Sequence, residues 1–194
     1  MNRRVLDGRL VHFARWKYYG RLLLLMILPY ILASHATAQS TTADEYEIRA
    51  AMLFNLTKFI EWPSWKFDAA HPQFSICLVG ADPVGADLDS LLQNKVVNSK
   101  PVVVRHLSSL DSVADCHILY IGSSARKNVS RASAELEKGA VLTVSEKSNA
   151  DIPKQVVGLP TVDEHVRIEV NLSAAQRSGF TVSSKLLHLA TVTH

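Results

Sequence analysis

Several features of enzymes and membrane proteins are missing from this 194-residue sequence. It has two cysteines, and its eight histidines form neither an H-x-x-x-H nor an H-E-x-x-H pattern. No glycine-rich stretch ends in G-K-S or G-K-T, so a P-loop is not indicated. We therefore expect no metal, no cofactor and no catalytic function.

Long apolar runs are also missing. The longest, residues 22–32, has eleven residues, and about 20 are needed to cross a hydrocarbon core. It follows a basic segment and precedes Ala36-Thr37-Ala38, an A-x-A cleavage pattern. Residues 1–38 are therefore predicted to be a signal peptide cleaved after Ala38, with an uncleaved membrane anchor as the weaker alternative. We expect the mature protein in the periplasm.

The basic character of the chain lies in this leader. The whole sequence has a formal net charge of +3, but after residue 38 fifteen basic and seventeen acidic residues remain, a net charge of −2. No basic stripe is left, so nucleic-acid binding is not indicated. Residues 39–194 have the length of one ordinary domain.

Strands and helices are predicted to alternate in the middle of the chain. Four short runs are almost continuously apolar, as in strands covered on both faces: Phe74–Val79, Pro101–Val104, His117–Ile121 and Ala140–Val144. Helices are expected between them at Val84–Leu92, with Asp82 as N-cap and Pro83 at the first helical position, and at Ala125–Lys138. This order predicts a single α/β domain of three layers, with a mostly parallel sheet and helices on both faces.

The two ends of the domain add further elements. A first helix is predicted from a capping box at Thr42 through Ile60, stopped by Trp62-Pro63. Near the C-terminus, Val156–Thr161 and His165–Val170 are predicted to form a hairpin around the link 162–164, which makes the sheet mixed. Asn171 and Ser183 are expected to cap two short last helices.

Several sequence motifs follow one another along the mature chain. Residues 51–63 read AMLFNLTKFIEWP, which fits A-x-L-(Y/F)-N-x-x-K-F-x-E-W-P. Further motifs are GADPVG at 80–85, CHILYI at 116–121, RIEVNL at 167–172 and SSKLLHLA at 183–190. In content and order these phrases resemble those of the YfiR-like family of periplasmic regulators, and the resemblance spans most of the mature chain.

The resemblance implies a regulator that works by binding other proteins. Such proteins bind the periplasmic sensory region of an inner-membrane diguanylate cyclase and repress the cyclase, which lowers cyclic-di-GMP and biofilm formation. An OmpA-like outer-membrane lipoprotein relieves this repression, and the regulator is expected to be a homodimer. Two other functions remain open: a small-molecule-binding module with a pocket at the strand ends, and a secreted α/β hydrolase.

Cys77 and Cys116 are expected to form a disulfide, because a cysteine pair in an oxidising compartment tends to close. The resemblance supports the same pairing. Strand geometry argues against it. If Gly80 and Gly122 lie level, Cys77 faces position 119 and Cys116 lies roughly 10 Å away along the sheet, beyond the disulfide reach of about 7 Å. Two small buried hydrophobic residues are the alternative.

Glu169, Arg177 and, more weakly, Lys66 are the candidate partner-binding residues, because the first two lie in the C-terminal part of the resemblance. A surface ion pair of little energetic value is the alternative for them. The aromatic residues of the early region are expected to pack in the core: Phe54, Phe59, Trp62 and Trp65.

Two short motifs have stronger structural than chemical interpretations. Residues 124–127 spell S-x-x-K, the order found in penicillin-recognising enzymes, but the accompanying S-D-N and K-T-G phrases are missing. Ser124 is therefore predicted to be a helix cap. The GADPVG phrase is expected to form a structural turn, because Asp82 would repel a phosphate at that helix N-terminus.

Overall fold

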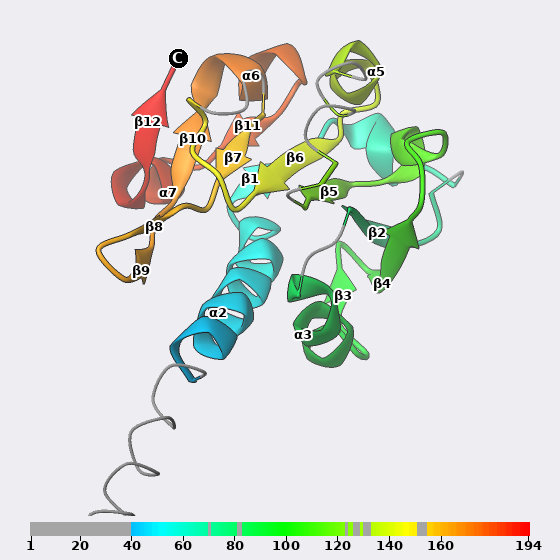
Figure 1. The fold of residues 1–194 in the computed structure, drawn as a ribbon. Coiled ribbons are helices and arrows are strands. Elements are labelled where there is room, and N and C mark those ends of the chain that lie inside the picture. Colours follow the sequence, from blue (N-terminus) through cyan, green and yellow to red (C-terminus); the bar gives the residue numbers. More distant parts are fainter. Residues whose placement is uncertain are drawn as a thin grey trace, which may run out of the picture. The chain divides into compact units, whose positions relative to one another are not determined.

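An eight-stranded mixed sheet organises the fold of the computed structural model (Figure 1). The structure describes residues 40–194 except 70, 81–82, 123, 126–128, 130–132 and 151–154, so the predicted signal peptide 1–38 lies outside the described residues. Residues Ala43–His194 form one compact unit. Among the described residues, no helix is both long and apolar enough for a membrane span.

The sheet has the strand order β12-β10-β7-β6-β5-β2-β4-β3. Its strands are β2 (Phe74–Val79), β3 (Val96–Val97), β4 (Lys100–Leu107), β5 (Ile118–Ile121), β6 (Leu142–Ser145), β7 (Val157–Gly158), β10 (Glu169–Asn171) and β12 (Thr191–Thr193). The pairs β2–β4, β2–β5, β5–β6, β6–β7 and β10–β12 are parallel, whereas β3–β4 and β7–β10 are antiparallel. The prediction of a mostly parallel sheet that a C-terminal hairpin makes mixed is confirmed, whereas the antiparallel edge strand β3 was not predicted.

Apolar clusters cover both faces of the sheet. In β2, Ile76 and Leu78 point into the larger cluster, whereas Cys77 and Val79 point into the smaller one. The helices α2 (Ser40–Leu56), α3 (Val84–Leu91), α6 (Leu172–Arg177) and α7 (Ser184–Leu189) contribute to the larger cluster. The helix α5 (Ser133–Lys138) contributes Leu136 to the smaller cluster. Helices therefore pack on both faces, as predicted for three layers.

Both predicted caps of the last two helices are confirmed. The side chain of Asn171 accepts a hydrogen bond from the Ala174 N–H at the start of α6, and Ser183 accepts one from the Leu186 N–H at the start of α7. Each cap satisfies an N–H group that has no partner within its helix.

The first helix differs from its prediction at both ends. It begins at Ser40, so Thr42 lies inside the helix, and it ends at Leu56, before Phe59 and Ile60. The Thr57 Oγ1 hydroxyl donates to the Phe54 carbonyl, and the next residues form tight turns. Ile60–Glu61 then becomes β1, paired antiparallel with β11 (Thr181–Val182), because this pairing offers the backbone an alternative to the helix.

Two other boundaries shift by small amounts. Pro83 occupies the cap position of α3 instead of the first helical position, and Asp82 lies outside the described residues. The hairpin link has two residues, Asp163 and Glu164, because Val162 pairs with His165 between β8 (Thr161–Val162) and β9 (His165–Val166). Part of the helix predicted over Ala125–Lys138 also lies outside the described residues.

Candidate functional site

The disulfide between Cys77 and Cys116 is present, and both residues are fully buried. The predicted strand register is also correct, because Cys77 in β2 lies opposite Leu119 in β5. The predicted separation was wrong because Cys116 does not belong to β5. It follows the 3₁₀ turn η3 (Val113–Asp115), and its Cα lies 5.9 Å from that of Cys77, within disulfide reach.

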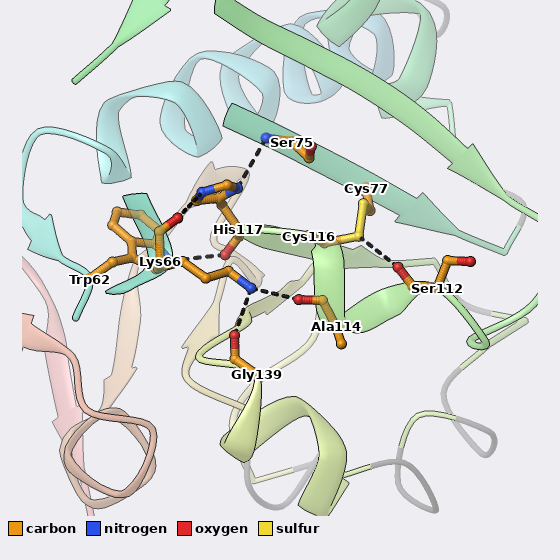
Figure 2. The surroundings of a disulfide bond; sticks show 9 residues. All are labelled: Trp62, Lys66, Ser75, Cys77, Ser112, Ala114, Cys116, His117 and Gly139. Carbon is orange, nitrogen blue, oxygen red and sulfur yellow. Dashed lines mark hydrogen bonds between the residues drawn. A yellow bond between two sulfur atoms is a disulfide. The ribbon is translucent and has the colours of Figure 1, made fainter. Parts of the chain in front are cut away.

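Lys66 is the most unusual charged residue near this bond (Figure 2). It belongs to the 3₁₀ turn η2 (Ser64–Phe67), and none of its surface is exposed. Its Nζ donates to the carbonyl oxygens of Ala114 at 2.6 Å and Gly139 at 2.7 Å. Burial lowers the pKa of Lys66 to about 8, against the opposing effect of Asp115. The ammonium thus ties three segments together in the interior.

His117 continues this network on the other side of Cys116. Its Nδ1 accepts the Ser75 backbone N–H at 3.2 Å, so Nε2 carries the proton and donates to the Lys66 carbonyl at 3.1 Å. Burial lowers the pKa of His117 to about 4, with the hydrogen bond to Lys66 opposing. The Trp62 Nε1 group donates to the His117 carbonyl at 3.1 Å. The imidazole is therefore a neutral part of the core.

Aromatic rings surround this histidine at the amino ends of β2 and β5. Trp62 contacts Phe74 and Phe180 edge-on at ring-centroid distances of 5.4 and 5.7 Å, and Phe74 lies 4.5 Å from His117. Phe67 packs at 5.4 Å from the same imidazole. The core role predicted for Trp62 is confirmed, whereas Trp65 is 48% exposed.

A groove of about 590 Å³ lies beside this aromatic cluster. Its lining residues are Phe54, Thr57, Lys58, Ile60, Glu61, Trp62, Phe67, Val96, Val97 and Asn98. They come from the end of α2 and the turn after it, from β1 and the adjoining Trp62, from η2, and from β3 and the turn after it. The groove therefore lies toward the amino ends of the parallel strands, opposite the carboxyl ends where open α/β sheets bind ligands.

The three predicted contact residues have different surroundings. The Glu169 Oε2 atom accepts hydrogen bonds from Ser148 Oγ at 2.8 Å and the Asn149 backbone N–H at 2.7 Å, which tethers the loop after β6 to β10. Arg177 forms an exposed pair with Glu137 at 3.4 Å. Lys66 is enclosed by the fold, so the structure gives it an internal role and offers a partner no surface there.

A comparison with protein families matches the YfiR/HmsC-like family over residues 46–191. The chain belongs to the YfiR/HmsC-like family. A search of curated proteins finds no significant match. The family matched is regulatory and not catalytic. The matched range runs through nearly the whole compact unit, from α2 to β12.

The hydrolase alternative gains no support in this YfiR/HmsC-like protein. Ser124 is exposed, and Lys127, its partner in the S-x-x-K motif, lies outside the described residues. A methyl group built on Gly80 would come within 2.8 Å of the Ser124 Oγ atom, so backbone and hydroxyl pack closely at the ends of β2 and β5. Residues 81–82 of the predicted GADPVG turn lie outside the described residues, so that turn stays a prediction.

Sequence reasoning missed two buried networks of this YfiR/HmsC-like protein. Lys66 was placed among surface contacts, and His117 was considered only as a metal ligand and rejected. Arg49 was not singled out, although it is 4% exposed and its guanidinium donates to Thr161 Oγ1 at 2.6 Å and to the Leu159 carbonyl at 3.4 Å. The sequence offered one signal for Lys66, His117 and Arg49, which is that each has an apolar residue on both sides. Among the described residues, no cluster of three or more acidic, histidine or cysteine side chains could hold a metal.

Proposed function

We propose that this protein is an exported periplasmic regulator that represses an inner-membrane diguanylate cyclase by binding its periplasmic sensory region. Repression lowers cyclic-di-GMP and biofilm formation, and an OmpA-like outer-membrane lipoprotein relieves it by sequestering the regulator, which acts as a homodimer. The observation that carries this proposal is the YfiR/HmsC-like match over residues 46–191. A disulfide in the fold is consistent with an oxidising compartment.

Regulation by binding requires a difference in affinity, because a ligand shifts an equilibrium only when it binds two states or competitors unequally. Arg177 suits such a contact. Its pair with Glu137 is exposed, so exchanging Glu137 for a partner carboxylate costs little. Glu169 suits it less well, because its carboxylate already holds two groups of the loop after β6.

The test begins with deletion of the gene and measurement of cyclic-di-GMP. We expect the level to rise, and expression of the wild-type chain to restore it. Expression of Arg177→Ala should restore it incompletely, whereas the exposed-lysine control Lys185→Ala should match the wild type. An unchanged cyclic-di-GMP level, with no cyclase recovered when the tagged protein is purified from membranes, would overturn the proposal.

The groove beside Trp62 favours one second candidate function, a small-molecule-binding module that serves a sensor or transporter. Thermal-shift measurements with a metabolite panel distinguish the two. The main proposal expects the purified cyclase sensory region, and no metabolite, to raise the melting temperature. A metabolite that does so, and fails to do so with Trp62→Ala or Val97→Ala, would favour the second function.

A further inference from the structure

The turn that carries Cys116 is held at more points than its disulfide. The bond to Cys77 fixes one end of η3 to β2. The His117 backbone N–H donates to the Ser75 carbonyl at 2.8 Å at the exit of the turn. The Lys66 ammonium reaches the turn from a different direction, through the Ala114 carbonyl two residues before Cys116 (Figure 2).

The lysine contact has properties that make it an independent anchor. Lys66 lies in η2, whereas the disulfide partner Cys77 lies in β2. The Lys66 ammonium also donates to the carbonyl of Gly139, which precedes β6. The residue is fully buried, so water does not compete for its donors. Hydrogen bonds from a charged donor are stronger than neutral ones, and a low local dielectric strengthens them further.

We propose that Lys66 is a second clamp on the Val113–Cys116 turn, so that the turn stays closed when the Cys77–Cys116 disulfide is reduced and opens only when both anchors are lost. The folded conformation of the turn is then insensitive to thiol reduction at this bond, although the free energy of unfolding of the whole chain is not. This inference concerns the fold of the chain and does not depend on the proposed cyclase partner.

The proposal is tested by hydrogen exchange on the purified protein, with and without a phosphine reductant. The disulfide oxidises the phosphine to its oxide and becomes two thiols, and one water molecule supplies the oxygen atom of the oxide and the two thiol protons. Four samples are compared: wild type and Lys66→Met, each oxidised and reduced. The reporters are the Cys116 N–H, which bonds the Val113 carbonyl, and the His117 N–H. Ile118–Ile121 in β5 reports global unfolding, and Lys95→Met is the matched control at an exposed lysine.

We expect exchange in the turn to rise less than about threefold on reducing the wild type or on introducing Lys66→Met alone. In reduced Lys66→Met it should rise more than about tenfold, without an equal rise at Ile118–Ile121. A tenfold rise in the reduced wild type would show that the disulfide alone holds the turn. Unchanged exchange in reduced Lys66→Met would show that neither anchor is needed. Either result overturns the proposal.

If Lys66→Met does not fold, the wild type itself answers the question. Raising the pH of reduced protein from about 7 to about 9 removes most of the charge from Lys66, whose pKa is about 8, and with it the charge that strengthens its two hydrogen bonds. Maleimide labelling of Cys116, divided by labelling of the urea-unfolded chain at the same pH, should then rise about tenfold. The neighbouring groups that share this environment are Asp115 in η3, His117, His71 and Lys100. An unchanged ratio would contradict the clamp.

Discussion

His117 has to remain neutral for the core network to persist. Its Nδ1 accepts the Ser75 N–H, so a proton on that nitrogen would break the bond and leave a cation among aromatic rings. The pKa of His117 is about 4 in the fold against 6.5 for a free histidine. Between these two values the unfolded chain binds more protons than the folded one, so stability falls as the pH falls.

We therefore predict an acid-dependent loss of stability that His117→Gln removes. The contribution of His117 to the free energy of unfolding should be constant above about pH 6.5 and fall toward pH 4, with roughly 3 kcal/mol as its upper bound. Glutamine keeps one acceptor and one donor but does not titrate. Urea unfolding across this pH range checks the slope, and His188→Gln on the surface serves as the control. An equal slope in the His117→Gln protein would contradict the prediction.

Arg49 joins α2 to the residues around β8. Like His117, it is a buried polar residue whose hydrogen bonds we expect to stabilise the fold. Its buried guanidinium bonds the Leu159 carbonyl and Thr161 Oγ1 and pairs with Glu45 at 3.2 Å. Truncation to methionine would leave these acceptors unsatisfied. We predict that Arg49→Met lowers the free energy of unfolding by about 2–3 kcal/mol, because buried bonds to a charged group have about this value.

Urea unfolding monitored by tryptophan fluorescence measures this loss. Arg167→Met is the matched control, because Arg167 is exposed and only its backbone N–H has a described bond, to Pro160. We expect that control to stay within about 0.5 kcal/mol of the wild type. Equal losses of unfolding free energy in the two variants would mean that the buried bonds of Arg49 stabilise the fold no more than an exposed arginine does.

At the scale of elements, the sequence predicts more of the sheet than of the connections. The continuous apolar runs locate β2, β5 and β6, because strands buried on both faces require them. Such a run also locates β4, although that strand is only partly covered and none of its residues is buried. The end of α2 was missed because its helical periodicity continues through Ile60, where tertiary pairing with β11 decides the structure. The Cys116 turn was missed because a strand was extended one residue beyond where the chain turns back.

The β8–β9 hairpin offers a prediction about one turn. Asp163 and Glu164 both have positive φ, 50° and 62°, as a two-residue type I′ turn requires. Glycine adopts this conformation without the steric cost that a side chain incurs. Glu164→Gly should therefore raise the free energy of unfolding by about 0.5–1 kcal/mol.

Thermal and urea unfolding check the sign of that effect. The matched control is Glu47→Gly, an exposed glutamate inside α2, where glycine should lower stability by about 1 kcal/mol. Stabilisation at residue 164 with destabilisation at residue 47 separates turn geometry from loss of a negative charge. Equal signs in the two variants would contradict the type I′ explanation.

For the whole molecule, the order of apolar runs and helices along the sequence predicts the α/β class and its layers. It does not predict the contacts of Lys66 and Cys116 inside the fold. Lys66 and Cys116 are brought together by the path of the chain between β4 and β5, and no local spacing shows where that path runs. The disulfide was expected from compartment and resemblance against a geometric objection. It forms because η3 returns over the face of the sheet that Cys77 occupies.

The disulfide should stabilise the molecule chiefly through its unfolded state. It closes a loop with a sequence separation of 39, and the loss of chain entropy on closing such a loop corresponds to about 4 kcal/mol. We predict that Cys77→Ala/Cys116→Ala lowers the free energy of unfolding by about 3–4 kcal/mol, and that reduced wild type loses nearly as much. This global loss is compatible with a turn that stays closed in the folded state, because Lys66 acts on the native turn and the disulfide on the unfolded chain. Urea unfolding of oxidised protein, reduced protein and double variant measures all three values. A loss below about 1 kcal/mol in both altered forms would mean that the unfolded chain is already restricted between these two cysteines.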